Sequence, residues 1–307
     1  MMSTVLKVEN LSHRYSSAWA IRDLNFEISQ TGVIGLLGSN GAGKSTTMNI
    51  ICGVLKQTEG DVYINGINKK NDPRLAKRQL GFLPQTPPLY ADFTVNEYLT
   101  YAADLRFIEK TQVKKAVAEA MDKTGISHFS SRLIKNLSGG YKQRVGIAQA
   151  IIHKPSVVIL DEPTNGLDPN QIIEARKLIR EIGNDHIVLL SSHVLSEINL
   201  LCRDIIMIEG GRIVFSDSMD SFNNYLQPSS VIAIMENPPP ETELTKIAGV
   251  TRVEFLTGKQ CRIFFNGNTN ITETIIAASM QHQWRLQEIH LERSLLDDVF
   301  KQLSRQS

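Results

Sequence analysis

Residues 31–55 read TGVIGLLGSNGAGKSTTMNIICGVL, and this stretch decides the fold. An apolar run is followed by a glycine-rich loop and then by a segment with helical character. Residues 38–46, GSNGAGKST, fit the pattern G-x-x-x-x-G-K-[ST], whose glycines let backbone N–H groups turn inward around phosphate oxygens. The helix that follows directs the positive end of its dipole at the same anion. The sequence therefore predicts a strand, a phosphate-binding loop and a helix, in that order.

The side chains of this loop have separate expected tasks. Lys44 would reach the β- and γ-phosphates of a nucleotide, and the Ser45 hydroxyl would bind Mg²⁺. A glycine-rich turn with a chance lysine would explain the letters, but it would not require a strand before them and a helix after them. We expect the nucleotide to be held by the whole loop, namely Gly38, Ser39, Asn40, Gly41, Ala42, Gly43, Lys44, Ser45 and Thr46.

Strands that alternate with helices are expected on both sides of the loop. Residues 5–8 and 24–28 are typical of short strands joined by a polar turn. Helical spacing of apolar residues covers 94–124. Further along the chain, SVVILDEP and IVLLSSH are typical of buried parallel strands, and QIIEARKLIREIG between them has one apolar helical face. This order predicts an α/β layered fold.

Three polar side chains at the ends of the two buried strands are candidates for chemistry. Asp161 could hold Mg²⁺ or its water shell. Glu162 follows directly, and alternation along an extended strand would turn it in a different direction, where it could activate water as a general base. A solvated acidic pair is the plainer alternative. His193 follows the second strand, although a lone histidine is more often a structural hydrogen-bonding residue.

The remaining motifs make the chain resemble the ABC ATPases. Residues 137–144, LSGGYKQR, resemble the signature sequence of that family, and residues 157–163, VVILDEP, resemble its Walker B segment. The other family positions are matched by Tyr15 as the adenine-stacking aromatic, Gln85 as the Q-loop, GLD at 166–168 as the D-loop, and His193 as the switch histidine. One such motif would say little, but the ordered set extends from Tyr15 to His193.

The resemblance implies a P-loop NTPase core of the ABC type, with a helical subdomain over about residues 86–136 and ATP and Mg²⁺ as its ligands. It implies that Ser138, Gly139 and Gly140 contact the γ-phosphate of an ATP held by a second subunit, either an identical copy or a relative. Asp168 would lie on that interface, and Trp19 competes with Tyr15 for adenine. The implied catalytic residues are Glu162, His193 and Lys44, and the implied metal ligands are Ser45, Gln85 and Asp161.

The resemblance also implies a role in transport, in which the helical subdomain docks on a transmembrane permease. Residues 296–300, LDDVF, resemble the L-E-D-V-F motif of bacterial drug, lipid and polysaccharide exporters, with Asp297 in place of the usual glutamate. A plain amphipathic helix is the alternative, and several importer ATPases also carry C-terminal domains. A soluble ABC ATPase acting on ribosomes or DNA is less favoured by a chain with one cassette, no sustained heptads and no basic stretch. A small-molecule kinase that uses the same phosphate loop is disfavoured, because such enzymes do not require the LSGGYKQR sequence.

Composition is compatible with this function. The chain has 307 residues, 42% hydrophobic and 21% charged, and a net charge of +1, which does not favour nucleic acid as a partner. Three scattered cysteines fit a reducing cytosol. Since neither a signal peptide nor ~18 consecutive apolar residues are found, we expect a peripheral protein on the cytoplasmic side of the membrane, whose partner supplies the membrane part.

A second, smaller domain is expected at residues 218–307, after an ABC ATPase domain at 1–217. The segments VIAIM, TRVEFL, QCRIFF and WRLQEIHL are typical of strands, and TELTKIA, ITETIIAASMQHQ and LLDDVFKQL of helices. Apart from the closing helix, their order is β-α-β-β-α-β, which is the ferredoxin-like arrangement.

Overall fold

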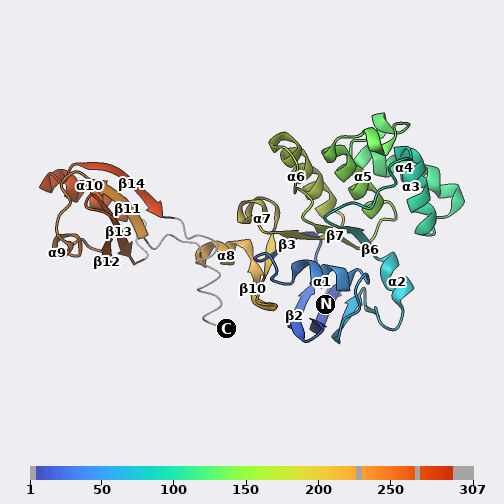
Figure 1. Ribbon diagram of the computed structural model, residues 1–307, viewed down its shortest axis with the longest axis horizontal. Coiled ribbons are helices and arrows are strands. Elements are labelled where there is room, and N and C mark those ends of the chain that lie inside the picture. Colours follow the sequence, from blue (N-terminus) through green and yellow to red (C-terminus); the bar gives the residue numbers. More distant parts are fainter. Residues whose placement is uncertain (1–4, 226–229, 267–269, 293–307) are drawn as a thin grey trace. The chain divides into compact units, whose positions relative to one another are not determined.

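The structure, a computed structural model, describes residues 5–225, 230–266 and 270–292. The chain divides into two compact units, Met1–Met219 and Asp220–Ser307, which are described separately below as the N-terminal and C-terminal units (Figure 1). The boundary predicted from the sequence, between residues 217 and 218, falls close to this division.

A six-stranded sheet of order β10-β9-β3-β8-β7-β6 forms the centre of the N-terminal unit. Neighbouring strands are parallel except at β10, which is antiparallel to β9. Continuous apolar runs explain why the central strands are buried on both faces. The bounds are β3 (Gly32–Leu37), β6 (Leu80–Leu83), β7 (Val157–Asp161), β8 (Ile187–Ser192), β9 (Asp204–Glu209) and β10 (Arg212–Ser218).

Helices cover both faces of this sheet (Figure 1). The helix α1 (Lys44–Ile51) lies between it and a second, antiparallel sheet of order β2-β1-β4-β5, and the main hydrophobic core fills this layer. The other face carries α5 (Gly139–Ile151) and α6 (Pro169–Gly183). The remaining elements are β1 (Leu6–Tyr15), β2 (Ala18–Ile28), β4 (Glu59–Ile64), β5 (Ile67–Asn68), α2 (Pro73–Arg78) and α7 (Leu195–Leu201).

One prediction for this unit gave strands that are too short. The strands expected at 5–8 and 24–28 extend into one long hairpin, β1 and β2, whose pairing is shifted at several points. Asn10 and Asp23 have left-handed backbones, with φ of 47° and 56°. Such irregularities break the apolar alternation by which strands are recognised, so the expected strands were too short.

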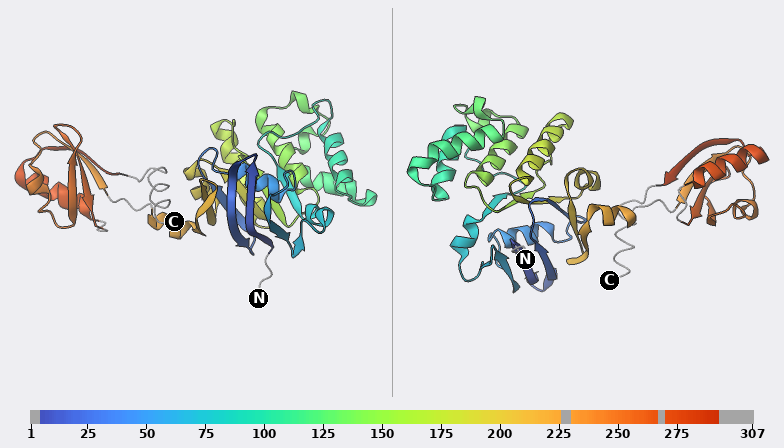
Figure 2. Two further views of the ribbon diagram at one scale, coloured as in Figure 1. Left: turned by 60° about the horizontal axis from the view of Figure 1, so that its bottom comes forward. Right: turned by 180° about the vertical axis from the view of Figure 1, so that it is seen from behind.

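The helical pattern over 94–124 forms two helices, α3 (Val95–Leu105) and α4 (Lys110–Lys123). The chain turns between them at Phe107, whose φ is 58°. Thr94 and Glu97 form a capping box at the start of α3, which satisfies backbone donors there. These helices and α5 share a separate hydrophobic core, and two further views show them gathered on one side of the N-terminal unit (Figure 2).

The C-terminal unit has the predicted ferredoxin-like arrangement. Its four strands have the order β12-β13-β11-β14, and every pairing is antiparallel. A core around Val231, Ile263 and Trp284 holds the sheet against α10. The bounds are α8 (Met219–Tyr225), β11 (Ser230–Met235), α9 (Glu241–Leu244), β12 (Val250–Phe255), β13 (Gln260–Phe265), α10 (Ile271–His282) and β14 (Leu286–Glu292). The expected closing helix and the LDDVF segment lie outside the described residues.

Because this unit has its own core, deleting residues 220–307 should leave ATP binding intact. We expect the Kd for ATP, measured by fluorescence titration, to change by less than about twofold, roughly 0.4 kcal/mol. Ile263→Asp in the full chain is the matched control, because it disrupts only the C-terminal core. If the truncated chain fails to fold by circular dichroism, the N-terminal unit depends on its neighbour.

Within the described residues, no helix is both long enough and apolar enough to cross a membrane.

Candidate nucleotide site

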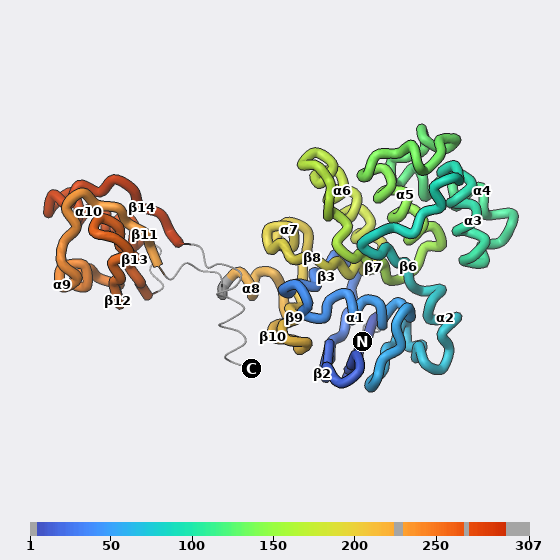
Figure 3. Tube along the Cα trace, viewed as in Figure 1, coloured from blue at the N-terminus to red at the C-terminus, as the bar shows by residue number. Residues whose placement is uncertain are grey.

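The candidate residues lie where parallel strands end. The loop at residues 38–43 leaves β3 and enters α1, a path that can be followed in Figure 3. Glu162 follows β7, His193 follows β8 and Gln85 follows β6 by two residues of loop. These strands are parallel and belong to one sheet, so their carboxyl ends lie at the same edge. Ligands of open α/β sheets bind at that edge.

The loop takes a path that side chains would block. Gly41 and Gly43 have φ values of 84° and 109°, a region that disfavours residues with a Cβ. A Cβ at Gly43 would also collide with the Ile21 side chain, and one at Gly38 with the carbonyl of Ile208. The loop can therefore curve around an anion with its N–H groups free of side-chain obstruction, as phosphate binding requires.

The ammonium group of Lys44 lies inside this loop. Its Nζ donates hydrogen bonds to the carbonyl oxygens of Gly38, at 2.9 Å, and Ser39, at 3.0 Å. Burial lowers the pKa of Lys44, while the nearby carboxylates of Glu162, Asp161 and Glu209 act in the opposite direction. A buried cation beside open N–H groups is suited to phosphate oxygens, so the residues present fit a nucleoside triphosphate.

Oxygen ligands for a hard cation lie next to the loop. Ser45 Oγ is 3.3 Å from Asp161 Oδ1, and Asp161 is 5% exposed. Hydroxyl and carboxylate oxygens suit Mg²⁺, which usually keeps one or two protein ligands and takes the rest from phosphates and water. The described residues contain no group of three or more His, Cys, Asp or Glu side chains that could hold a metal by themselves. The donor set fits Mg²⁺ bound together with a phosphate chain.

Glu162 contacts the histidine predicted from the neighbouring strand. His193 Nδ1 lies 2.9 Å from Glu162 Oε1, whereas Oε2 has only a long contact with Asn165 Nδ2, at 3.4 Å. The expectation that strand alternation directs Glu162 is wrong. The strand β7 ends at Asp161, and Glu162 has a left-handed backbone with φ of 47°. Glu162 therefore leaves the strand axis because its own backbone turns.

The signature segment is exposed at Ser138 and Gly139 and buried at Gly140. Ser138 caps α5, but its side chain makes no capping hydrogen bond, and a Cβ at Gly139 would meet nothing within 4 Å. Gly140 is packed against the Gln171 side chain of α6. Within the part of the chain that the structure describes, no hydrogen bond or ion pair joins this segment to the loop at residues 38–46. The expected contact with the ATP of a second subunit stays a prediction.

Three further expectations concern exposed residues. Tyr15 is 54% exposed and touches His13 edge-on, with ring centroids 4.7 Å apart. Trp19 has two guanidinium groups over its ring, from Arg14 and Arg22 at 5.8 and 5.7 Å, which favours Tyr15 as the free stacking surface. Gln85 is exposed. Asp168 accepts a hydrogen bond from the backbone of Gln171 as the N-cap of α6, so it has a local structural task.

Sequence reasoning missed two residues of this site. Glu209 accepts a hydrogen bond from Ser39 Oγ at 2.9 Å, and Ser191 Oγ lies 2.5 Å from Asp161 Oδ1. Glu209 ends an apolar strand, as Asp161 does, and that signal could have identified it. Ser191 breaks the apolar run IVLL, but its partner lies on another strand.

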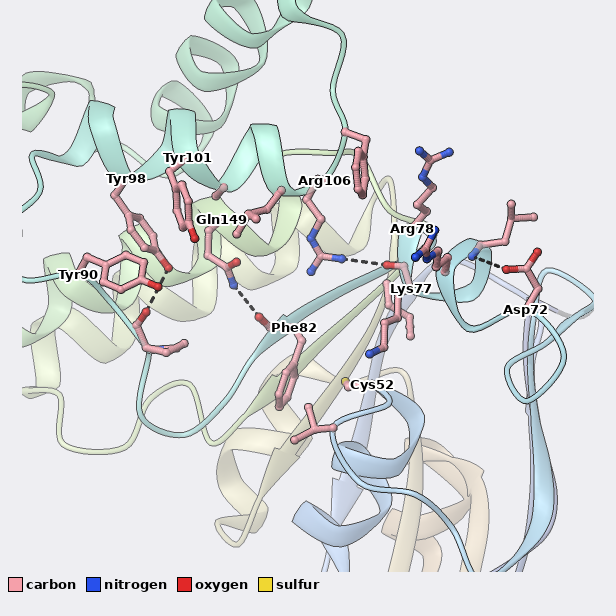
Figure 4. Close-up of a pocket in the computed structure, with 18 residues that line it drawn as sticks. Cys52, Asp72, Lys77, Arg78, Phe82, Tyr90, Tyr98, Tyr101, Arg106 and Gln149 are labelled. Carbon is pink, nitrogen blue, oxygen red and sulfur yellow. Dashed lines mark hydrogen bonds between the residues drawn. The ribbon is translucent and has the colours of Figure 1, made fainter.

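A cavity of about 1020 Å³ lies between the core and α3 (Figure 4). Tyr98 and Tyr101 of α3 and the nearby Tyr90 form one end, with centroids of Tyr90 and Tyr101 5.6 Å apart. The other end is basic. Arg106 Nη1 donates to the carbonyl of Lys77 at 2.9 Å, and the basic lining residues are Arg74, Lys77, Arg78 and Arg106.

The chain is similar to known proteins in both sequence and structure. The family model described as ABC transporter matches residues 21–165. The bacitracin transport ATP-binding protein of Bacillus licheniformis is 38% identical over 69% of this chain and 69% of its own. The linearmycin resistance ATP-binding protein of Bacillus subtilis (strain 168) is 27% identical over 98% of both chains. A solved dimeric ATP-binding cassette in a post-hydrolysis state, bound to ADP and Pi, is 25% identical over 70% of this chain and 98% of its own, with a TM-score of 0.63.

Proposed function

Because the chain belongs to the ABC transporter family of ATP-binding, ATP-hydrolysing proteins, we propose that it powers a membrane permease and that the transport is export. The observation that carries this proposal is that Lys44, Asp161, Glu162 and His193 lie together at one sheet edge, an arrangement suited to ATP hydrolysis. Export is supported by the bacitracin transport and linearmycin resistance relatives and by the LDDVF segment.

In the proposed mechanism, the loop and Lys44 bind the phosphate chain, and Tyr15 stacks on adenine. Mg²⁺, held by Ser45, Gln85 and Asp161, would supply neutralisation of the phosphate charge. Transfer of a phosphoryl group to water needs positioning and charge neutralisation more than covalent chemistry.

Glu162 is the proposed general base. Its Oε1 is taken by His193 Nδ1, so Oε2 is the oxygen that can accept a proton from the attacking water. The contact with His193 holds the carboxylate in one orientation, which makes His193 a partner in placing the water.

A second cassette completes the proposed site. The signature segment Ser138–Gly140 begins α5, with open space around Gly139, and this helix has 13 residues over which its dipole accumulates. We expect an anion bound there to come from another subunit, because within the described residues no hydrogen bond or ion pair joins the segment to its own phosphate loop. We propose a dimer that closes around two ATP molecules and opens after hydrolysis. Its second member is an identical copy or a relative.

The cavity beside α3 is the proposed docking site for the permease. Leu105 and Phe107 are exposed on its wall, which favours an apolar partner segment, and the basic end favours an acidic side chain on that segment. Gln85 lies in the chain between Phe82 and Pro88, which both line the cavity. If nucleotide displaces Gln85, the adjoining cavity wall would move against a permease segment bound there. This movement would couple hydrolysis to transport.

Leu105→Asp combined with Arg78→Glu should separate the chain from its permease. We expect each change to weaken the complex by about 2 kcal/mol, roughly thirtyfold, because each removes a complementary contact. The measurement is co-purification with the membrane protein encoded beside this gene, with ATPase activity of the isolated chain as a second readout. Leu256→Asp, at an exposed position of the C-terminal unit, is the matched control.

Retention of the permease by the double variant would exclude this cavity as its docking site. If the unmodified chain stays fully soluble when the neighbouring membrane protein is co-expressed, the transport proposal fails and a soluble ABC ATPase acting on ribosomes or DNA is favoured.

A further inference from the structure

The buried hydroxyl group of Ser191 contacts both Asp161, a proposed metal ligand, and Glu162, the proposed general base. Ser191 lies in β8, opposite Asp161 of β7, and is 0% exposed. Its Oγ is 2.5 Å from Asp161 Oδ1 and 2.9 Å from the backbone nitrogen of Glu162. Both partners belong to the proposed machinery for hydrolysis, so this inference rests on the proposed function.

The direction of these hydrogen bonds follows from their chemistry. The Glu162 N–H can only donate, so Ser191 Oγ accepts from it. The hydroxyl proton is then given to the Asp161 carboxylate, which can only accept when ionised. One proton and one lone pair of the same oxygen are thus committed to two different residues.

The contact with Asp161 also selects one of its oxygens. Ser191 and Ser45 both approach Oδ1, at 2.5 and 3.3 Å. In the described residues no hydrogen bond reaches Oδ2. Ser191 therefore leaves Oδ2 available for a cation or its water shell and keeps the carboxylate from rotating. Outer partners of metal ligands usually act in this way.

The contact with Glu162 stabilises an unfavourable backbone. A left-handed conformation is disfavoured for any residue with a Cβ and persists where the surroundings hold it. The hydrogen bond from Glu162 N–H to Ser191 is such a hold, and the same strand β8 leads into His193. The next residue has a different task, because Ser192 Oγ donates to Glu197 at 3.0 Å and accepts from Val194 N–H.

We propose that Ser191 is a positioning residue for ATP hydrolysis. It orients the Asp161 carboxylate for Mg²⁺, and it holds the backbone of Glu162 so that the Glu162 carboxylate can activate the attacking water. It acts through these two residues and does not itself touch the substrate.

Ser191→Ala tests the proposal, because it removes the hydroxyl and keeps the Cβ. We expect turnover to fall about 10- to 100-fold, and the gain in ATP affinity on adding Mg²⁺, measured by fluorescence titration, to shrink by several-fold. ATP affinity in EDTA should stay within about twofold, because the contacts of Lys44 with the loop are untouched. Ser191→Thr, which keeps the hydroxyl, should restore most of the Mg²⁺ effect.

Ser279→Ala is the matched control, since Ser279 is also a buried serine whose Oγ accepts a backbone N–H, that of Leu286 in the C-terminal unit. It should change neither readout. Equal losses of ATP affinity with and without Mg²⁺ in Ser191→Ala would show a general structural role and overturn the proposal.

Glu162→Gln distinguishes a failure of the role proposed for Ser191 from a failure of the proposed function of the site. If that variant loses turnover while Ser191→Ala keeps normal turnover and a normal Mg²⁺ effect, only the role of Ser191 is wrong. If Glu162→Gln itself keeps near-normal turnover, the proposed function of the site fails first.

Discussion

Glu162→Gln should lose nearly all ATP hydrolysis and still bind ATP. The amide has the shape of the carboxylate but cannot accept a proton from water, and loss of a general base typically lowers the rate about 10²- to 10⁴-fold. The phosphate loop and Lys44 are unchanged, so ATP affinity should stay near normal. Phosphate release and a nucleotide titration measure the two quantities separately.

The same variant should accumulate as an ATP-bound dimer. If hydrolysis opens the closed dimer, a chain that cannot hydrolyse stays closed, and light scattering should report twice the mass of the 34.3 kDa chain. Glu181→Gln is the matched control. Glu181 lies on α6 and forms a surface ion pair, in which its Oε1 is 4.0 Å from Lys177 Nζ. A strictly monomeric Glu162→Gln chain in saturating ATP contradicts the shared site, and near-normal turnover removes Glu162 as the base.

Lys44→Ala should lose ATP binding itself. Lys44 is buried within the loop, and removing one partner from a desolvated charge pair costs about 2–5 kcal/mol, roughly 30- to 4000-fold in Kd. The expected result is therefore opposite in kind to that of Glu162→Gln, where binding survives. A titration with a fluorescent ATP analogue measures the change.

Lys56→Ala controls for the loss of a positive charge, because Lys56 is exposed and lies a short distance beyond α1. It should bind ATP as the unmodified chain does. If Lys44→Ala keeps the affinity of this control, the lysine has no direct role in holding phosphate.

The sequence predicts those features that depend on neighbouring residues. The phosphate loop is one continuous segment, and Gly43, a glycine of its pattern, has the left-handed conformation that favours glycine. The apolar runs at β7 and β8 are buried parallel strands, as their composition predicts. In the C-terminal unit, alternation of apolar residues was sufficient to predict a ferredoxin-like order of strands and helices.

Features that depend on register between distant segments could not be predicted. Ser191 and Asp161 meet because β7 and β8 pair at that position, 30 residues apart in sequence. The left-handed turn at Glu162 has no local marker, since glutamate rarely adopts it. Phe107, two residues after the end of α3, likewise has a left-handed backbone at a turn without a glycine or a proline, and this turn lets α3 and α4 share a core.

The bonds of Lys44 to its own loop have a thermodynamic consequence. The hydrogen bonds from the Lys44 ammonium to the carbonyl oxygens of Gly38 and Ser39 hold the loop in its curved shape. Nucleotide binding is then expected to be an exchange, in which phosphate oxygens replace carbonyl oxygens as hydrogen-bond acceptors of the ammonium. Little conformational entropy remains to be lost, so association should be limited by desolvation of the triphosphate more than by ordering of the protein.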